Sequence, residues 1–120
     1  MVFIVDDSKG LRERLADMVS EINGIAVLGQ AGSAAEAIDG IRTLKPRVVI
    51  LDIQMPGGNG LEVLRTIKQE SHPPVVVMLT NHAYPQYRER CMGLGADYFL
   101  DKSREFERLV EIFQLLAESL

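Results

Sequence analysis

The chain has 120 residues, of which 47% are hydrophobic and 25% are charged, with 17 acidic against 13 basic side chains. This length fits one domain, and the apolar content excludes a disordered chain. The net charge of −4 argues against a nucleic-acid binder, and the single cysteine excludes an internal disulfide. No apolar run approaches the roughly 20 residues of a membrane helix. We therefore expect one cytoplasmic domain.

The first part of the chain alternates apolar runs with a segment of helical period. Val2–Val5 is apolar without polar alternation, which predicts a strand buried on both faces. Residues 9–22 place apolar side chains on one helical stripe, with Ser8 as the N-cap and Asn23-Gly24 as the stop. The next apolar run, Ile25–Leu28, predicts a second strand.

The middle of the chain repeats this alternation. Ser33 and Glu36 form a capping-box pattern for a helix that ends before Pro46, because a residue that precedes proline disfavours helical geometry. Val48–Leu51 then predicts a third buried strand. A further helix begins near Asn59-Gly60, after a glycine-rich loop.

The last part of the chain completes the pattern. Val75–Leu79 predicts a fourth strand, and a weakly marked helix follows from about residue 86 to residue 93. Tyr98–Leu100 predicts a fifth strand, and residues 106–120 carry an apolar stripe of helical period. Five strand–helix units in succession predict an α/β fold with a parallel sheet covered by helices on both faces.

Chemically active side chains stand at the ends of four predicted strands. Asp6-Asp7 follow the first strand, Asp52 the third, Thr80 the fourth and Asp101-Lys102 the fifth. Ligands of open parallel sheets bind outside the carboxyl ends of the strands, so these side chains are expected to converge. Oxygen ligands suit Mg2+, while a lysine and a hydroxyl suit phosphoryl oxygens. The pattern therefore predicts metal-assisted phosphoryl transfer with a carboxylate available as nucleophile.

Each of these side chains also has an ordinary structural explanation. A single Asp after a strand is most often a turn residue or a helix N-cap, and a single Lys at a strand end is most often a solvated charge. Turn chemistry does not account for acids, a hydroxyl and a lysine at four separate strand ends. We therefore favour the functional interpretation of the combined pattern.

At these residues the sequence resembles the receiver domain of two-component response regulators, of the chemotaxis-regulator-like kind. The matching motifs are Asp6-Asp7, Val48–Pro56 around Asp52, Leu79-Thr80 and Gly95–Lys102. The resemblance covers the whole chain, so residues 1–120 would form one receiver domain with no output domain present. It implies a flavodoxin-like, doubly wound (βα)5 three-layer sandwich with a five-stranded parallel sheet of strand order 2-1-3-4-5.

The resemblance also implies a role for each residue of the candidate site. Asp52 would be the phosphoacceptor, and Lys102 and Thr80 would each contact a phosphoryl oxygen. The metal, Mg2+ or possible Mn2+, would bind Asp7 and Asp52 directly and Asp6 through water. The backbone carbonyl of Gln54 would complete the metal ligands.

Two further pairs of residues follow from the resemblance. Thr80 and Phe99 would form the conformational switch, with the neighbouring Tyr98 as the alternative to Phe99. Gln54 and His82 lie two residues past the phosphoacceptor and past Thr80, and they would tune the dephosphorylation rate. His82 has an equally plausible reading as an exposed loop histidine.

The implied partners are a sensor histidine kinase or a histidine phosphotransfer protein. The signal would leave through the face of the helix at 86–93, the strand at 98–100 and the helix at 106–120, where a homodimer is possible. The chain itself would not bind nucleic acid or membrane. It would not be an enzyme beyond self-phosphorylation and autodephosphorylation.

Three other classes of protein remain open at this point. A phosphatase of the haloacid dehalogenase type would need a second Asp where Gln54 stands. A flavodoxin-like cofactor binder would need a Ser-, Thr- or Gly-rich loop where Asp6–Lys9 stands. A pseudo-receiver that serves only as an interaction module would lack part of the acidic set, which is complete here.

Overall fold

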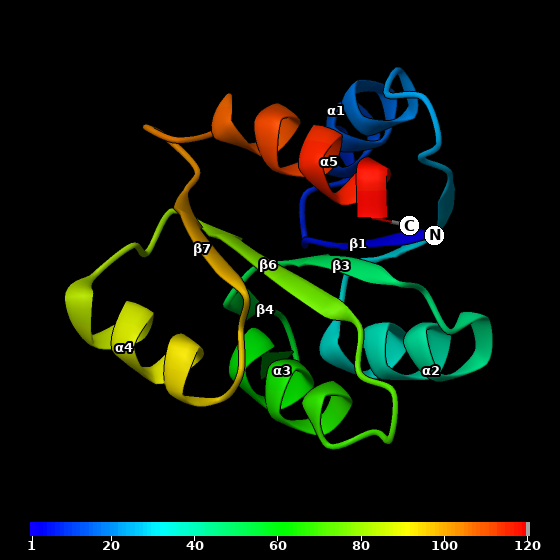
Figure 1. The fold of residues 1–120 in the computed structure, drawn as a ribbon. Helices are drawn as coiled ribbons and strands as arrows, with labels where there is room; N and C mark the ends of the chain where they lie inside the picture. Colours follow the sequence, from blue (N-terminus) through cyan, green and yellow to red (C-terminus); the bar gives the residue numbers. More distant parts are fainter. Residues whose placement is uncertain (120) are drawn as a thin grey trace.

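The computed structural model describes residues 1–119, and over that range strands alternate with helices (Figure 1). The strands are β1 (Val2–Val5), β2 (Val27–Ala31), β3 (Val48–Leu51), β4 (Gln54–Met55), β5 (Gly58–Asn59), β6 (Val75–Thr80) and β7 (Tyr98–Asp101). The helices are α1 (Lys9–Ser20), α2 (Ala34–Leu44), α3 (Gly60–Lys68), α4 (Pro85–Gly93) and α5 (Arg108–Ser119). The final residue of the helix expected over 106–120 lies outside the described residues.

Within residues 1–119, five strands form one sheet in the order β2-β1-β3-β6-β7, and every neighbouring pair is parallel. Counting these five strands along the chain gives the order 2-1-3-4-5. Helices α1 and α5 cover one face of the sheet, and α2, α3 and α4 cover the other (Figure 1). The predicted flavodoxin-like, doubly wound three-layer sandwich is confirmed.

Two apolar layers hold the sheet between its helices. Successive side chains of a strand point to opposite faces, and β1 divides its residues accordingly. Val2 and Ile4 belong to the layer that contains Leu15 of α1 and Phe113 of α5, whereas Phe3 belongs to the layer beneath α2 and α3. Burial of each large side chain contributes about 1.5–3 kcal/mol. This packing makes the central strands a rigid frame for the residues at their ends.

The second strand differs from its prediction. The apolar run Ile25–Leu28 predicted its position, but β2 begins at Val27 and continues to Ala31. β2 is an edge strand with side chains of alternating exposure, and Leu28 is 43% exposed. A continuous apolar run was therefore the wrong signal for it. Its position follows from pairing with β1, because Val5 lies opposite Ala31 and the two strands end at the same level.

Side-chain caps explain where three of the helices begin. Ser8, Ser33 and Asn59 each accept a hydrogen bond from the backbone amide three residues later. Such caps satisfy amides that have no partner within the helix. The predicted starts of α1, α2 and α3 are confirmed, and the strand-to-helix connections of the site therefore have defined geometry.

Two helix ends lie inside the predicted boundaries. α1 ends at Ser20, two residues earlier than expected. α5 begins at Arg108 rather than at residue 106. The carboxylate of Asp101 accepts hydrogen bonds from the amide and the hydroxyl of Ser103, which keep the segment before α5 in turns. Helical periodicity in the sequence does not reveal that side-chain hydrogen bonds of this kind compete with helix formation.

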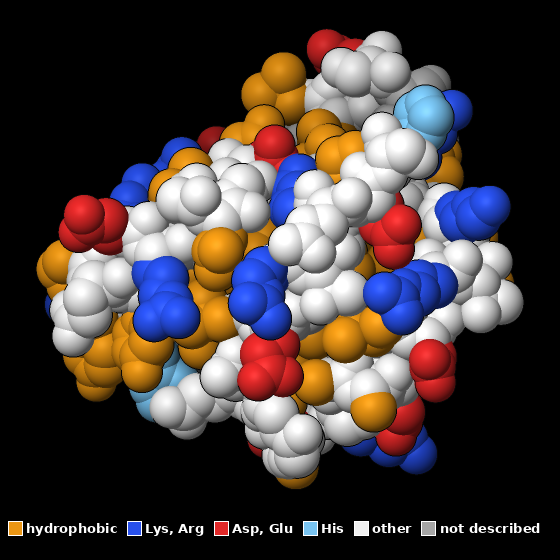
Figure 2. Space-filling view, turned by 90° about the horizontal axis from the view of Figure 1, so that it is seen from below, with side chains coloured by type: hydrophobic (Ala, Val, Ile, Leu, Met, Phe, Trp, Pro, Cys, Tyr) orange, Lys and Arg blue, Asp and Glu red, His pale blue; other side chains and the backbone are white. Residues whose placement is uncertain are grey.

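The outer surface of the α2–α3–α4 layer mixes side chains of different kinds. Figure 2 shows Lys and Arg side chains dispersed among hydrophobic and acidic ones on this face. Large exposed hydrophobic residues include Leu44 at the end of α2 and Met92 on α4. Of the helices within residues 1–119, none has the length and apolarity to cross a membrane.

Candidate functional site

Three carboxylates meet at the carboxyl edge of the sheet, in the part of the chain that the structure describes. One oxygen each of Asp6, Asp7 and Asp52 lies within 4.8 Å of the others. Parallel pairing of β1 with β3 sets Val5 opposite Leu51, and the acids follow directly. Asp6 and Asp52 are 2% and 6% exposed, whereas Asp7 is open to solvent. The predicted convergence of the acids is confirmed.

Lys102 lies between the two buried acids. Its Nζ donates to Asp6 Oδ2 at 2.7 Å and to Asp52 Oδ2 at 2.9 Å, and its side chain is 12% exposed. Burial acts to lower the pKa of Lys102, but the hydrogen bonds to the two carboxylates outweigh it and hold that pKa above its ordinary value. The ammonium is therefore charged at neutral pH.

The charges of the cluster suit a divalent cation. Three carboxylates and one ammonium leave two negative charges. Oxygen ligands of this kind match a hard ion such as Mg2+, which binds one or two carboxylates and keeps several waters. Asp7 is the member that faces solvent, so an ion can reach the cluster from that side. The residues present therefore fit the expected metal.

Both carboxylate oxygens of Asp52 accept a hydrogen bond. Oδ1 accepts the amide of Ile53 at 2.7 Å, and Oδ2 accepts the ammonium of Lys102. The backbone of Asp52 packs directly on Gly60, where an added Cβ would stand 1.8 Å from the Asp52 carbonyl oxygen. Only a residue without a side chain allows this approach. The start of α3 and the candidate nucleophile are thus in direct contact.

A short hairpin, which the sequence did not predict, follows Asp52. β4 pairs antiparallel with β5, with Gln54 opposite Asn59, and Gly57 at the turn has φ +74°. The hairpin and Asp7 line an open depression of about 390 Å3. Gln54 is exposed on this hairpin, beside the acidic cluster.

Thr80 ends β6 and is completely buried. Its Oγ1 accepts the amide of His82 at 3.0 Å, and its carbonyl accepts the amide of Lys102 at 2.9 Å. Thr80 thereby connects the loop after β6 with the lysine at the end of β7. His82 is half-buried on that loop, and its ring centroid lies 6.2 Å from that of Tyr84.

The two aromatic residues of β7 face opposite layers. Phe99 is 5% exposed and belongs to the apolar layer on the α4 side, whereas Tyr98 packs against the layer on the α5 side. Arg88 of α4 donates through Nη1 to the Phe99 carbonyl at 3.4 Å, and its guanidinium carbon lies 5.8 Å from the Phe99 ring centroid. The side chain of Phe99 therefore lies between the sheet and α4.

Two residues that the sequence analysis did not select also contact the site. One is Gly60, which a glycine-rich loop after a candidate nucleophile could have indicated. The other is Arg12, whose Nη1 donates to the main-chain carbonyl of Asp6 at 2.7 Å. An arginine on the first turns of a helix carries no sequence signal for such a contact.

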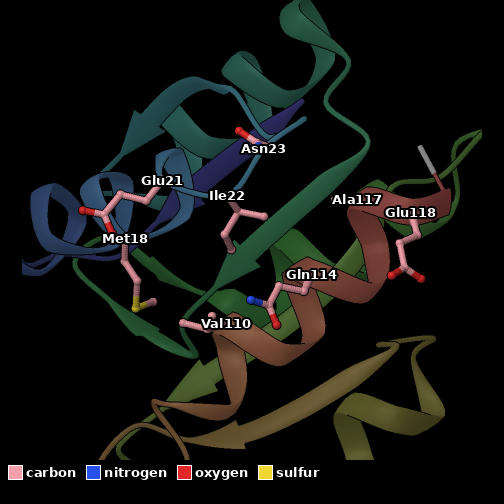
Figure 3. Close-up of a pocket in the computed structure, with 8 residues that line it drawn as sticks. All are labelled: Met18, Glu21, Ile22, Asn23, Val110, Gln114, Ala117 and Glu118. Carbon is pink, nitrogen blue, oxygen red and sulfur yellow. The ribbon is translucent and has the colours of Figure 1, made fainter.

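Other cavities lie away from the acidic cluster. A groove of about 690 Å3 runs between α1 and α5, with Met18 and Val110 among the residues that line it (Figure 3).

Cys91 of α4 is buried, and burial raises the pKa of its thiol to about 11, against a smaller opposing effect of Arg90. Its thiol is therefore protonated at neutral pH and is not a nucleophile.

Comparison with known protein families gives one match over most of the chain. The family model described as the response regulator receiver domain matches residues 2–114. A curated relative, an uncharacterized response regulatory protein of Vibrio cholerae, is 40% identical over 113 residues. These residues are 94% of this chain and 46% of that protein. The chain spans about half the length of the curated relatives it matches.

Solved structures give the same result. The response regulator domain of CheB from Thermotoga maritima superposes with a TM-score of 0.86 at 27% identity, covering 98% of this chain and 92% of that chain. A chain in the CheX–CheY–BeF3–Mg2+ complex from Borrelia burgdorferi superposes with a TM-score of 0.79 at 27% identity, covering 93% and 87%.

Proposed function

Because this chain belongs to the response regulator receiver family of two-component systems, we propose that Asp52 is its phosphoacceptor. The phosphoacceptor role is general for the family. The observation that carries the assignment is the ammonium of Lys102, held between Asp6 and Asp52 at 2.7 and 2.9 Å. In this position the ammonium can exchange a carboxylate oxygen for a phosphoryl oxygen without leaving the site.

The proposed reaction moves a phosphoryl group from a phosphohistidine to Asp52. A carboxylate oxygen of Asp52 attacks the phosphorus, the phosphorus–nitrogen bond breaks, and the electron pair returns to the imidazole of the donor protein. Lys102 then stabilises the negative charge of the phosphoryl group. The hydroxyl of Thr80, now an acceptor for the His82 amide, donates to a second phosphoryl oxygen.

Receiver domains bind Mg2+ at an acidic pocket, and the Asp cluster of this chain fits that ion. We propose Asp7 and Asp52 as direct ligands, Asp6 as a ligand through water, and the backbone carbonyl of Gln54 as a further ligand. Mn2+ has the same preference for oxygen ligands. The ion, when bound, supplies charge neutralisation for the incoming phosphoryl group.

We propose that the donor is a sensor histidine kinase or a histidine phosphotransfer protein of the cytoplasm. Movement of Thr80 and Phe99 on phosphorylation would change the α4–β7–α5 face. Arg88 on this face contacts Phe99, so α4 is coupled to the residue proposed to move. The face would then bind an output partner or a second copy of the chain.

The direct test is phosphorylation by a small phosphodonor. Incubation with Mg2+ and acetyl phosphate is expected to give one covalent phosphoryl adduct per chain, measured by intact mass and lost in base. Asp52→Asn is expected to give no adduct, and Asp39→Asn is the matched control because Asp39 lies on α2, outside the site.

Three results would contradict the proposal in different ways. An adduct that persists in Asp52→Asn would move the phosphoacceptor to another residue. Catalytic turnover of unrelated phosphoesters would favour a phosphatase. The absence of any adduct in the Mg2+-loaded protein would favour a pseudo-receiver that acts only as an interaction module.

We further propose that Gln54 and His82 set the lifetime of the phosphoryl group. Both lie beside the site, Gln54 on the hairpin after Asp52 and His82 on the loop after Thr80. Replacing both by Ala is expected to change the rate at which the adduct disappears after donor removal. An unchanged lifetime would contradict this role.

A further inference from the structure

Arg12 of α1 reaches back over the β1–α1 loop toward the acidic cluster. Its Nη1 donates to the main-chain carbonyl of Asp6 at 2.7 Å. Its Nε is buried and has no hydrogen-bond partner among the described residues. The position of the guanidinium is therefore set by the bond to Asp6 and not by complete pairing of its donors.

Gly32, which follows β2, leaves the space that the guanidinium occupies. A Cβ at this position would stand 3.0 Å from Nη1 of Arg12 and 3.7 Å from the carbonyl oxygen of Asp6. A side chain at residue 32 would therefore press on the hydrogen bond between Arg12 and Asp6. The contact therefore involves the residue after β1, a residue of α1 and the residue after β2.

The bond from Arg12 completes the fixation of Asp6. The Asp6 amide donates to the carbonyl of Ala31 at 3.1 Å. Its Oδ1 accepts the amide of Ser8 at 2.9 Å, and its Oδ2 accepts the ammonium of Lys102. With Arg12 on the carbonyl, the amide, the carbonyl and both carboxylate oxygens of Asp6 each have a hydrogen-bond partner. The peptide that joins Asp6 to Asp7 therefore has one defined orientation.

Asp7 differs from Asp6 in its surroundings. It is exposed, and in the described part of the chain its carboxylate accepts no hydrogen bond. Its oxygen nevertheless lies within 4.8 Å of those of Asp6 and Asp52. The backbone from which this side chain projects begins at the preceding peptide, whose carbonyl accepts the bond from Arg12.

We propose that Arg12 is a positioning residue for the metal-binding acids. It locks the Asp6–Asp7 peptide so that the exposed carboxylate of Asp7 faces Asp52 before any ion binds. The inference rests on the proposed function, because it takes the Asp cluster as the metal site. Residues that orient metal ligands in this way control metal affinity, although they do not touch the ion.

The test compares Mg2+ binding by three variants and the unsubstituted protein. Arg12→Met removes the donor and keeps the apolar stem, while Arg12→Lys keeps a charged donor. Lys9→Met is the control for the loss of one positive charge, because Lys9 is exposed at the start of the same helix. The Mg2+ dissociation constant is measured by NMR titration of the backbone amides around Asp7 and Asp52.

Arg12→Met is expected to weaken Mg2+ binding about tenfold, within the range found when residues that orient metal ligands are replaced. Arg12→Lys is expected to restore most of this affinity, and Lys9→Met to leave it close to that of the unsubstituted protein. Phosphorylation by acetyl phosphate at saturating Mg2+ is expected to change little, because the role concerns ion binding and not the transfer step.

Gly32→Ala provides a second test that retains Arg12. The added methyl group crowds Nη1, so a smaller loss of Mg2+ affinity is expected even if Arg12→Met does not fold. If the unsubstituted protein binds Mg2+ and Arg12→Met binds it equally well, the positioning role is overturned. If Arg12→Met is unfolded, unchanged Mg2+ affinity in Gly32→Ala overturns that role instead. If the unsubstituted protein binds no Mg2+, the proposed function itself is overturned.

Discussion

The acidic cluster at the carboxyl end of the parallel sheet and the cleft at its amino end differ in how far their charges are buried. At the carboxyl end, Lys102 is 12% exposed and pairs with two buried acids at 2.7 and 2.9 Å. At the amino end, a cleft of about 920 Å3 lies between the end of α2 and the segment before β6. Its one ion pair among the described residues joins Arg42 to Glu70 at 3.4 Å, with side chains 57% and 48% exposed.

This difference shows that burial determines how strongly paired charges interact. Asp6 and Asp52, which follow β1 and β3, are buried, and Lys102 after β7 is 12% exposed, so these charges interact in a partly desolvated environment. The Arg42–Glu70 pair of this cleft lies on the surface, where water and salt screen it. A second pair at the amino end, Lys68 with Asp97 at 2.8 Å, is less exposed, at 15% and 39% of the two side chains. The same kinds of side chain therefore form a site in the acidic cluster and only a polar surface at the Arg42–Glu70 pair.

The largest effect is expected when the buried ammonium is removed. Lys102→Met leaves Asp6 and Asp52 without their cation, and the metal-free protein is expected to lose about 3 kcal/mol of unfolding free energy. Mg2+ should recover part of this loss, because it binds only the folded state. Urea unfolding with and without Mg2+ measures both effects, with Lys9→Met as the control. A loss as small as that of a surface ion pair would contradict the contrast between the two edges.

Gly60→Ala is expected to have the next largest effect. The new Cβ would collide with the carbonyl oxygen of Asp52, so the backbone of β3 or α3 must shift at a cost of about 2–3 kcal/mol. Gly10→Ala is the matched control, since nothing lies within 4 Å of a Cβ there and α1 gains about 0.5 kcal/mol. Equal unfolding midpoints for the two variants would argue against the close contact at the site.

The pH dependence of stability distinguishes the buried cation from exposed ones. Because the pKa of Lys102 is raised in the folded state, its stabilising contribution is fully present below its ordinary value of 10.5. The contribution is lost as the pH rises through the folded-state pKa. The stability difference between the unsubstituted protein and Lys102→Met is therefore expected to be constant to about pH 10 and to shrink above it. A difference that grew with alkaline pH would contradict this sign.

A smaller effect of opposite direction is expected at Asp7. Asp7→Ala removes one like charge from the cluster, so the metal-free protein is expected to be as stable or more stable, by up to about 1 kcal/mol. The same variant is expected to lose Mg2+-dependent phosphorylation. Thermal unfolding without metal, together with the adduct assay, measures both results. A large loss of thermal stability would show that Asp7 has a structural role.

The smallest effect is expected at the amino end of the sheet. Arg42→Ala breaks a long and exposed ion pair, and the unfolding free energy is expected to change by less than about 0.5 kcal/mol. Glu70→Gln is the matched partner variant. Urea unfolding at low and high salt checks this value. A loss comparable to that of Lys102→Met would abolish the distinction between the edges.

Much of the candidate site was predictable because it depends on strand ends. Asp52 follows a continuous apolar strand, and Asp6 follows another, so their meeting at one sheet edge requires only the parallel topology. The second strand was placed wrongly, since an edge strand with Leu28 exposed lacks the apolar signal of a central one. That error did not affect the site, because no acid of the cluster follows β2.

The sequence by itself determined the order of the five strands of the main sheet and of the helices, the caps of three helices and the residue types gathered at the sheet edge. These depend on local periodicity and on residue type, which the chain displays directly. Tertiary structure alone decided that Phe99 faces α4, that Gly60 touches Asp52 and that Arg12 holds the peptide before Asp7. Each of these depends on distances between elements remote in sequence, and such distances are set by packing of the whole core.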